Sequence, residues 1–444
     1  MRNVLLVTRN FAPTSHVSVE RAIKLAKYLP QFGWRPTVLT GDPPSVGLPS
    51  DPDLVEQVRG IRILKARAPE LSLFYRRPTT GQAEGGSALR SAPKRGPWHP
   101  KAWAVPDSQL LWYPFAVRTA LRSAPSAHWD AVVATTFPPT ALLIGHAVAA
   151  RLGVPFVPDF RDAWTRYHNA PRRPAPLTRY ERWLETHVLA DAAAVVAVDH
   201  RMVAEPLARL PAAQRPPFHL IPNGYDEEDF AGTRPRALPP FSIVHAGQLR
   251  RAPRSLWAAL ARLLQRRFDL AGQIHVWQIG FVDAAAAVEL GAPPEGIVVH
   301  VVPPVPQREA IGYMLGADLL LVEEFHAVMP SKTLQYLRAG RPVLGLLDGG
   351  GALSDVLRAI PHAHLVELDD VDGIAAVVDR LAGAPRGEPV PPSAEVAAYS
   401  RREIARRFAD LLDTACAHTA RQAVSSAEDR SVIPADLSAA RTTP

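Results

Sequence analysis

The chain has 444 residues, of which 47% are hydrophobic and 21% are charged, so we expect two or three folded domains rather than a disordered chain or a fibrous repeat. No apolar run approaches the ~20 residues that span a bilayer, which argues against a transmembrane helix. Fifty Lys and Arg residues against 43 Asp and Glu residues give a net charge of +7, and this excess predicts an anionic partner: nucleic acid, a membrane surface or a phosphate-bearing substrate.

The N-terminal half alternates between short apolar strands and helices. Residues 3–8 form the first predicted strand, a helix with apolar residues at helical spacing ends at Gly33, and residues 35–40 form the second strand. Units of this kind build parallel sheets with right-handed crossovers. Further strands are predicted at residues 130–135, 155–159 and 193–198.

A second run of alternation begins at Phe241, after a proline-rich stretch at residues 231–240 that we interpret as a linker. Its later strands are predicted at residues 273–279, 297–302, 319–322 and 342–346. We therefore predict an α/β fold in which two Rossmann-like domains, residues 1–230 and 241–392, face each other across a cleft.

Three segments fall outside these sheets. Residues 76–101 predict a long mobile loop, residues 393–418 a helix that packs back on the N-terminal domain, and residues 419–444 a disordered tail rich in Ala, Ser, Thr and charge. The single cysteine, Cys416, excludes an internal disulfide and is typical of a reducing compartment. The apolar stretch near the N-terminus is short, so we expect no signal peptide and a cytoplasmic protein.

The turns that follow the strands favour one kind of nucleotide ligand. The first turn, at residues 9–13, contains no glycine, so the dinucleotide-binding fingerprint is absent there, and the chain has no Walker A motif. The first turn of the second domain holds Gly247, followed by Arg250, Arg251 and Arg254. A glycine and several arginines at the start of a helix suit a pyrophosphate group held by positive charge.

A set of short motifs runs through both halves in a fixed order. In the N-terminal half they are Phe11-Ala12-Pro13, Arg21, Phe32-Gly33-Trp34, Pro106-Asp107, Thr136-Phe137-Pro138-Pro139 and Asp159-Phe160-Arg161-Asp162-Ala163-Trp164. They continue with Ile221-Pro222-Asn223-Gly224-Tyr225-Asp226, Gly247, Arg251 and Pro330-Ser331-Lys332-Thr333-Leu334-Gln335-Tyr336-Leu337. In these motifs the chain resembles the retaining GT-B glycosyltransferases of family four, in particular bacterial members that act on surface polysaccharides or related glycans.

This resemblance implies the transfer of a sugar from a nucleotide-diphosphate donor to a hydroxyl group of a glycan, lipid-linked or small-molecule acceptor, with retention at the anomeric carbon. The donor is expected on the C-terminal domain and the acceptor on the N-terminal domain. No metal and no cofactor are expected, since the nucleotide sugar is a co-substrate. Asp51-Pro52-Asp53 resembles a D-x-D metal motif, but it lies in a proline-rich loop and we interpret it as a turn.

The diphosphate is the leaving group, and in similar enzymes a lysine and an arginine neutralise it. The matching residues here are Lys332 and Arg251, with Arg250 and Arg254 as neighbours able to take the same role. Only six of the 50 basic residues are lysines, and no lysine other than Lys332 follows Lys101. The alternatives are a solvated lysine at a helix start and an exposed basic turn.

The position that contacts the nucleotide ribose departs from the family. Gln335 stands where relatives carry a glutamate, and Ala327 stands where many carry a second acidic residue. The resemblance also places Gly247 and Ser331 at the nucleotide. Glutamine hydrogen-bonds hydroxyl groups but carries no charge, so an altered ribose contact, a different donor, reduced activity and a plain helix residue all stay open.

Two further positions match functional residues of the family. Arg161 and Asp162 follow the predicted strand 155–159, where related enzymes have a pair that faces the donor sugar and the acceptor, so they are the candidate catalytic residues. A structural ion pair is the alternative. Ser15 and His16 occupy the loop in which many relatives carry a Gly-Gly pair near the donor or acceptor, and an ordinary surface histidine is the alternative for His16.

Residues 94–103 interleave basic residues with Trp98 and Trp103. This pattern is typical of peripheral contact with an anionic membrane face or a lipid-linked phosphate, and a solvated loop is the alternative. Scattered arginines and the lack of a recognised module argue against nucleic acid as the partner. Two other functions stay open: a nucleotide-sugar epimerase of the same fold, and a non-catalytic glycosyltransferase-like binding protein.

Overall fold

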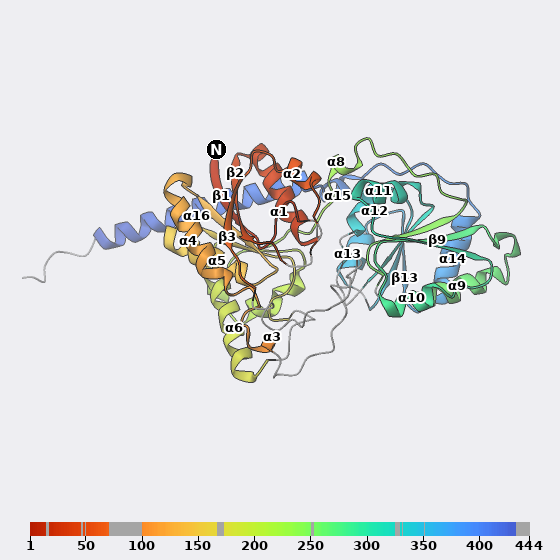
Figure 1. Ribbon diagram of the computed structural model, residues 1–444, viewed down its shortest axis with the longest axis horizontal. Helices are drawn as coiled ribbons and strands as arrows, with labels where there is room; N and C mark the ends of the chain where they lie inside the picture. Colours follow the sequence, from red (N-terminus) through yellow and green to blue (C-terminus); the bar gives the residue numbers. More distant parts are fainter. Residues whose placement is uncertain are drawn as a thin grey trace, which may run out of the picture. The chain divides into compact units, whose positions relative to one another are not determined.

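The computed structural model describes residues 1–14, 17–45, 48, 50–70, 100–166, 173–249, 253–324, 329–330, 332–349 and 351–431. Within these ranges the chain divides into two compact units. The first unit contains residues 1–70, 100–221 and 405–431, and the second contains residues 222–404. Each unit is built on one parallel sheet with helices on its faces (Figure 1).

The first unit has a seven-stranded sheet in the order β3-β2-β1-β4-β5-β6-β7, and every adjacent pair is parallel. Its strands are β1 (Arg2–Val7), β2 (Trp34–Asp42), β3 (Arg62–Arg67), β4 (Ala131–Thr135), β5 (Phe156–Phe160), β6 (Val195–Ala197) and β7 (Phe218–Leu220). Its α-helices are α1 (Val17–Tyr28), α2 (Asp53–Gln57), α3 (Pro100–Trp103), α4 (Trp112–Ala127), α5 (Thr140–Leu152), α6 (Ala175–Ala190) and α7 (Ala204–Ala208). Short 3₁₀ helices lie at Leu29–Phe32, His200–Met202 and Ala212–Gln214.

The second unit has a six-stranded parallel sheet in the order β10-β9-β8-β11-β12-β13. Its strands are β8 (Ser242–Ala246), β9 (Ile274–Ile279), β10 (Ile297–Val302), β11 (Leu319–Glu323), β12 (Val343–Leu347) and β13 (Ala363–Glu367). The helices are α8 (Glu227–Phe230), α9 (Arg254–Leu264), α10 (Ala284–Leu290), α11 (Gln307–Gly316), α12 (Thr333–Ala339), α13 (Ala352–Leu357), α14 (Val371–Ala382) and α15 (Ala394–Ala397), with a 3₁₀ turn at Phe268–Leu270.

These sheets confirm the predicted α/β class with two Rossmann-like domains. All of the strands predicted from buried apolar runs are present, and three further strands, β3, β7 and β13, were missed. Each missed strand forms an edge of its sheet or is only three residues long, and its residues are mostly half-buried or exposed. Such strands lack the continuous apolar run on which the prediction depends.

The boundary between the units differs from the predicted one. It lies after residue 221 rather than at residue 230, since α8 packs against α11 of the second unit. The predicted linker, residues 231–240, also lies along α11. The Arg236 N–H donates to the Gly312 carbonyl at 2.9 Å, and the Arg236 guanidinium lies 4.4 Å from the centre of the Tyr313 ring. The stretch is therefore a packed segment of the second unit.

The last helix, α16 (Arg401–Ser431), continues well into the tail that the sequence predicted to be disordered, and residues 432–444 lie outside the described residues. From residue 405 onward it belongs to the first unit. Its Asp413 carboxylate accepts hydrogen bonds from Arg2 at 2.8 Å and from the Trp34 indole N–H at 3.2 Å, and Arg407 donates to the Leu220 carbonyl at 2.6 Å. In the described part of the chain, no helix is long and apolar enough to cross a membrane.

Candidate functional site

The carboxyl ends of β8, β9 and β11 bring several polar residues to one edge of the second sheet. In an open parallel sheet, ligands bind beyond this edge. β8 ends at Ala246 and is followed by Gly247, which has a φ of +143°, a backbone conformation that favours glycine. β9 runs into Gly280, where an added Cβ would lie 2.5 Å from the Gly247 carbonyl oxygen. Glycine is thus required at 280 for the two turns to approach each other.

Lys332 lies next to Gly247. A Cβ built on Gly247 would be 4.0 Å from Lys332 Cγ, and the half-buried lysine donates a hydrogen bond from Nζ to Gln307 Oε1 at 2.9 Å. Lys332 immediately precedes α12, and the Tyr336 hydroxyl of that helix accepts a hydrogen bond from the Ala246 N–H at 2.6 Å. The structure therefore brings two predicted site residues, Lys332 and Gly247, together and anchors their helix to the end of β8.

Two residues that the sequence did not predict as part of the site, His245 and Gln278, support the Gly247 turn. Gln278 is 2% exposed, and its Nε2 donates to the Gly247 carbonyl at 2.9 Å. Because Nε2 is the donor, Oε1 accepts, and the His245 Nδ1 that lies 2.6 Å from it carries the proton. Burial lowers the pKa of His245, while this hydrogen bond acts in the opposite direction. A neutral histidine and a buried amide thus fix the backbone around Gly247.

Three buried oxygen atoms, two on α12 and one on the residue after β11, have no hydrogen-bond partner among the described residues: Gln335 Oε1, Thr333 Oγ1 and Glu324 Oε1. Gln335 is 6% exposed, and the other carboxylate oxygen of Glu324 accepts from the Asp348 N–H at 3.1 Å. Leaving a buried polar atom unpaired costs about 1–3 kcal/mol, so such atoms indicate a place where a further polar group binds. The predicted ribose-binding residue therefore lies one helical turn from Lys332, with a buried acceptor that is unpaired among the described residues.

The arginine cluster is described only in part. Arg250, Arg251 and Ser331, together with Ala327, lie outside the described residues. Arg254 begins α9, its side chain is 76% exposed, and its Nε donates to Glu289 Oε1 of α10 at 3.0 Å. Neither of its hydrogen bonds within the described ranges goes to Lys332 or Gly247. The structure places Arg254 in a surface ion pair with Glu289.

In the first unit, Arg161 and Asp162 follow the end of β5, as the sequence predicted. The Arg161 Nε donates to Thr135 Oγ1 at 2.7 Å, and its backbone N–H donates to Thr136 Oγ1 at 2.9 Å. The Thr136 hydroxyl in turn donates to the Asp162 carbonyl at 3.3 Å. Burial lowers the pKa of Arg161 to about 10, and the carboxylates of Asp159 and Asp162 oppose this shift. The turn after β5 is thereby fixed to the end of β4.

An ion pair beneath this turn holds three segments of the first unit together. Arg21 of α1 donates from Nε to Asp159 Oδ2 and from Nη2 to Asp159 Oδ1, each at 2.9 Å, and both side chains are 1% exposed. Nη2 also donates to the Ile221 carbonyl at 2.9 Å. The sequence analysis quoted Arg21 in a motif but assigned it no contact, since nothing local pairs it with a residue 138 positions later.

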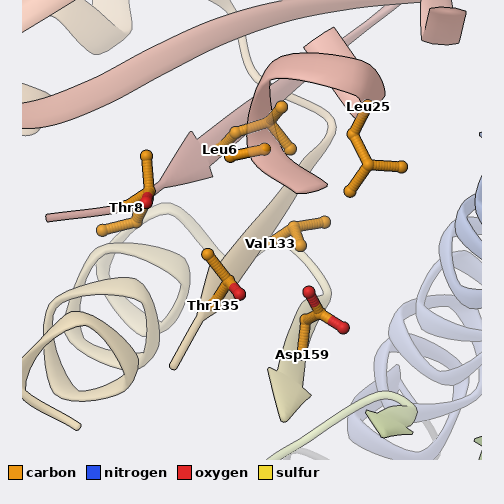
Figure 2. Close-up of a pocket in the computed structure, with 8 residues that line it drawn as sticks. Leu6, Thr8, Leu25, Val133, Thr135 and Asp159 are labelled. Carbon is orange, nitrogen blue, oxygen red and sulfur yellow. The ribbon is translucent and has the colours of Figure 1, made fainter. Parts of the chain in front are cut away.

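A small cavity adjoins this ion pair. Figure 2 shows Thr8, which follows β1, Thr135 of β4 and Asp159 of β5 among the residues that line it. Its volume of about 10 Å³ is near that of a single water molecule, which is too small for a sugar or a phosphate group. Trp164, the last residue of the same motif, is 2% exposed and donates from its indole N–H to Glu181 at 3.3 Å. The buried side chains of this motif therefore stabilise the fold.

The N-terminal candidates Ser15 and His16 lie outside the described residues, as do residues 76–99 of the predicted loop. The turn before them is well defined. Arg9 is 1% exposed and donates to Gln109 Oε1 at 2.7 Å, to the Pro43 carbonyl at 3.0 Å and to Glu70 Oε1 at 3.2 Å. The buried guanidinium of Arg9 thus makes its contacts within the protein and stabilises the first turn.

Comparisons with known proteins agree with this architecture. Residues 19–224 match the model of a family described as the glycosyl transferase 4-like domain. No curated protein matches the sequence significantly.

Similar solved structures cover nearly the whole chain. Sucrose-phosphate synthase from Thermosynechococcus elongatus matches with 14% identity and a TM-score of 0.56, over 96% of this chain and 100% of its own. An E. coli structure titled "Trehalose-6-phosphate from E. coli bound with UDP-2-fluoro glucose" matches with 13% identity and a TM-score of 0.60, over 92% and 99%. An Anabaena protein in complex with UDP and glucose matches with 14% identity and a TM-score of 0.50, over 95% and 99%. The chain therefore has the GT-B fold of these proteins.

Proposed function

We propose that the protein is a glycosyltransferase that moves a sugar from a nucleotide-diphosphate donor to a hydroxyl acceptor with retention of the anomeric configuration. The observation that carries this proposal is the position of Lys332, which lies beside Gly247 at the carboxyl edge of the second sheet. The family match over residues 19–224 and the similarity to structures with UDP or a UDP-sugar support it.

The donor diphosphate binds at the Gly247 turn in this proposal. As the bond between the sugar and the diphosphate breaks, negative charge develops on the leaving phosphate, and a cation fixed next to it stabilises that charge without a metal. Lys332 supplies the cation, with Arg251 as its partner. Gln335 accepts a hydrogen bond from a ribose hydroxyl through its buried Oε1, which has no partner among the described residues.

The acceptor binds to the first unit, with Arg161 and Asp162 at the reacting groups. The acceptor hydroxyl attacks the anomeric carbon from the face that the diphosphate leaves, and its proton passes to a donor phosphate oxygen. This route needs no pair of carboxylates flanking the sugar. Thr135 and Thr136 hold Arg161 and the Asp162 backbone in place. Arg161 and Asp162 would therefore orient substrates rather than exchange protons.

Peripheral binding to an anionic membrane, or to a lipid-linked acceptor, from the cytoplasmic side is part of the same proposal. Trp103 ends the basic, tryptophan-containing segment, and its side chain is 55% exposed, while residues 94–99 lie outside the described residues. An exposed indole suits the interface of a bilayer. Co-sedimentation with vesicles that contain anionic lipid should exceed co-sedimentation with neutral vesicles and should fall in Trp103→Ala.

The decisive experiment measures release of nucleoside diphosphate from a panel of nucleotide sugars, with and without acceptor glycans. Lys332→Ala should lower the turnover by about 10²–10³-fold while the circular dichroism spectrum stays unchanged. Lys65→Ala, which removes an exposed lysine of β3, is the matched control and should retain activity. Equal turnover in the Lys332 variant and the wild type would refute the assignment.

Two other outcomes identify the alternative functions. An epimerised nucleotide sugar that accumulates without any acceptor would identify an epimerase. Absence of calorimetric binding of every nucleotide sugar at millimolar concentration would identify a non-catalytic protein.

A further inference from the structure

A cluster of metal-ligating side chains lies on the helical layer of the first unit. His146 comes from α5, and His187 and Asp191 come from the end of α6 and the residue after it. One potential ligand atom of each residue lies within 4.8 Å of the other two. The cluster has no part in the proposed transfer reaction. The helices α5 and α6 lead away from the carboxyl ends of the strands, and the three residues lie within these helices or just after them.

The ring nitrogens of both histidines converge on one carboxylate oxygen. His146 Nε2 lies 2.8 Å from Asp191 Oδ2, and His187 Nε2 lies 3.8 Å from the same atom. In a tetrahedral zinc site with bond lengths of about 2.0–2.2 Å, ligand atoms are separated by about 3.3 Å. The first distance would have to grow and the second to shrink by about half an ångström to reach this separation, and the two nitrogens lie no more than 4.8 Å apart.

Aromatic neighbours orient both imidazoles. Trp183 stacks on His187 with ring centres 5.3 Å apart and planes 7° apart, and Tyr180 stacks on Trp183 at 5.8 Å. These residues occupy one face of α6 at intervals of three and four positions. His146 meets the ring of Phe156 edge-on at 5.9 Å and that of His187 edge-on at 5.3 Å. Rings held in this way lose less freedom when a metal binds.

The exposed fractions of the three side chains also suit a site that a metal ion can enter. The His146 side chain is 17% exposed, whereas those of His187 and Asp191 are about half exposed. The partly buried histidine comes from one helix and the accessible pair from the other, so a bound ion would connect α5 to α6. Two imidazoles and one carboxylate suit Zn²⁺, and three protein ligands leave a fourth coordination position for water.

We propose that His146, His187 and Asp191 form a Zn²⁺ site that fastens α5 to α6 on the surface of the first unit. Among the described residues, this is the one group of three His, Cys, Asp or Glu side chains close enough to share an ion. A hydrogen-bonded His–Asp pair alone would need only one of the two histidines. The second imidazole, stacked and aimed at the same oxygen, is the feature that a metal explains.

The test is calorimetric titration of the full-length protein with ZnCl₂ at neutral pH. We expect one equivalent to bind, and we expect His187→Ala and Asp191→Asn each to weaken binding at least tenfold. His200→Ala is the matched control, because His200 also lies beside an aspartate (3.6 Å from Asp199 Oδ1) and is exposed. This control should bind Zn²⁺ as the wild type does.

A second measurement separates loss of metal from loss of fold. Zn²⁺ should raise the melting temperature of the wild type and of the His200 variant, and it should leave that of the His187 variant unchanged, because a ligand stabilises only the state that binds it. The metal-free melting temperatures report whether each variant folds. Absence of Zn²⁺ binding to the wild type, or binding of wild-type strength in His146→Ala or His187→Ala, would overturn the proposal.

Discussion

Replacing Asp159 by asparagine tests the ion pair beneath the candidate catalytic turn. The change keeps the shape of the side chain and removes its charge. Arg21 and Asp159 are each 1% exposed and share two hydrogen bonds of 2.9 Å, so the guanidinium would stay buried without a counter-charge. Breaking a buried pair in this way typically costs about 3–5 kcal/mol. Because the amide oxygen still accepts one hydrogen bond, we expect a loss of about 3 kcal/mol, near the lower end.

Urea titration followed by circular dichroism measures this loss. For a unit of this size, about 3 kcal/mol corresponds to a fall of roughly 6–12 °C in melting temperature. The control is Arg2→Ala, which breaks the Arg2–Asp413 pair, whose side chains are 48% and 56% exposed, and should cost less than about 1 kcal/mol. An Asp159→Asn variant no less stable than this control would refute the reasoning. The double variant Arg21→Met/Asp159→Leu should recover most of the stability, since it removes both buried charges.

Three further predictions concern the Gly247 turn. Tyr336→Phe leaves the buried Ala246 N–H without its acceptor, which should lower the free energy of unfolding by about 1–3 kcal/mol in urea, and an unchanged midpoint would contradict the anchor. Gly247→Ala forces a side chain into a backbone conformation with φ of +143°, at a cost of about 1–3 kcal/mol, so calorimetry should show weaker binding of the donor nucleotide. Burial lowers the pKa of His245, so the unfolded state binds more protons below about pH 6.5 and stability falls with acidification. His245→Asn, which still donates to Gln278, should lose less stability between about pH 7.5 and pH 5.5 than the wild type loses.

The sequence predicted those parts of the fold that local patterns encode. The central strands β1, β4, β8 and β11 are short runs of buried apolar residues, which are visible without knowledge of their neighbours. The edge strand β3, with the sequence RILKAR, alternates charge with apolar residues and has one buried residue. It is a strand because β2 pairs with it, and that pairing cannot be seen locally.

The same distinction applies to the site. Gly247 and Lys332 were predicted from residue type and position, because a glycine after a strand and a rare lysine stand out in the sequence, and the structure brings the two together. Gln278 was missed because its partners, His245 and Gly247, are more than 30 positions away and meet it only when β8 and β9 pair. Only the folded backbone shows that the Gly247 carbonyl needs a donor and that the buried amide of Gln278 supplies it.

Several arginines of the first unit are buried crosslinks rather than surface charges. Arg9 and Arg21 are neutralised inside the first unit by Glu70 and Asp159. Arg173 donates to the carbonyls of Ala102, Ala104 and Pro106 as well as to Glu181, so one side chain fixes the backbone that precedes α4.

A guanidinium group suits this work because its five donors lie in one plane and reach several acceptors at once, whereas an ammonium group is a compact point charge. Arginines that serve as internal crosslinks are paired with carboxylates, so they form no surface for nucleic acid. The late, half-buried Lys332 differs from them in chemistry and lies at the carboxyl edge of the second sheet, where we propose that the donor binds. Its replacement by arginine should therefore keep the charge but lower donor turnover, because a guanidinium presents its donors in a fixed planar fork rather than as a compact point charge.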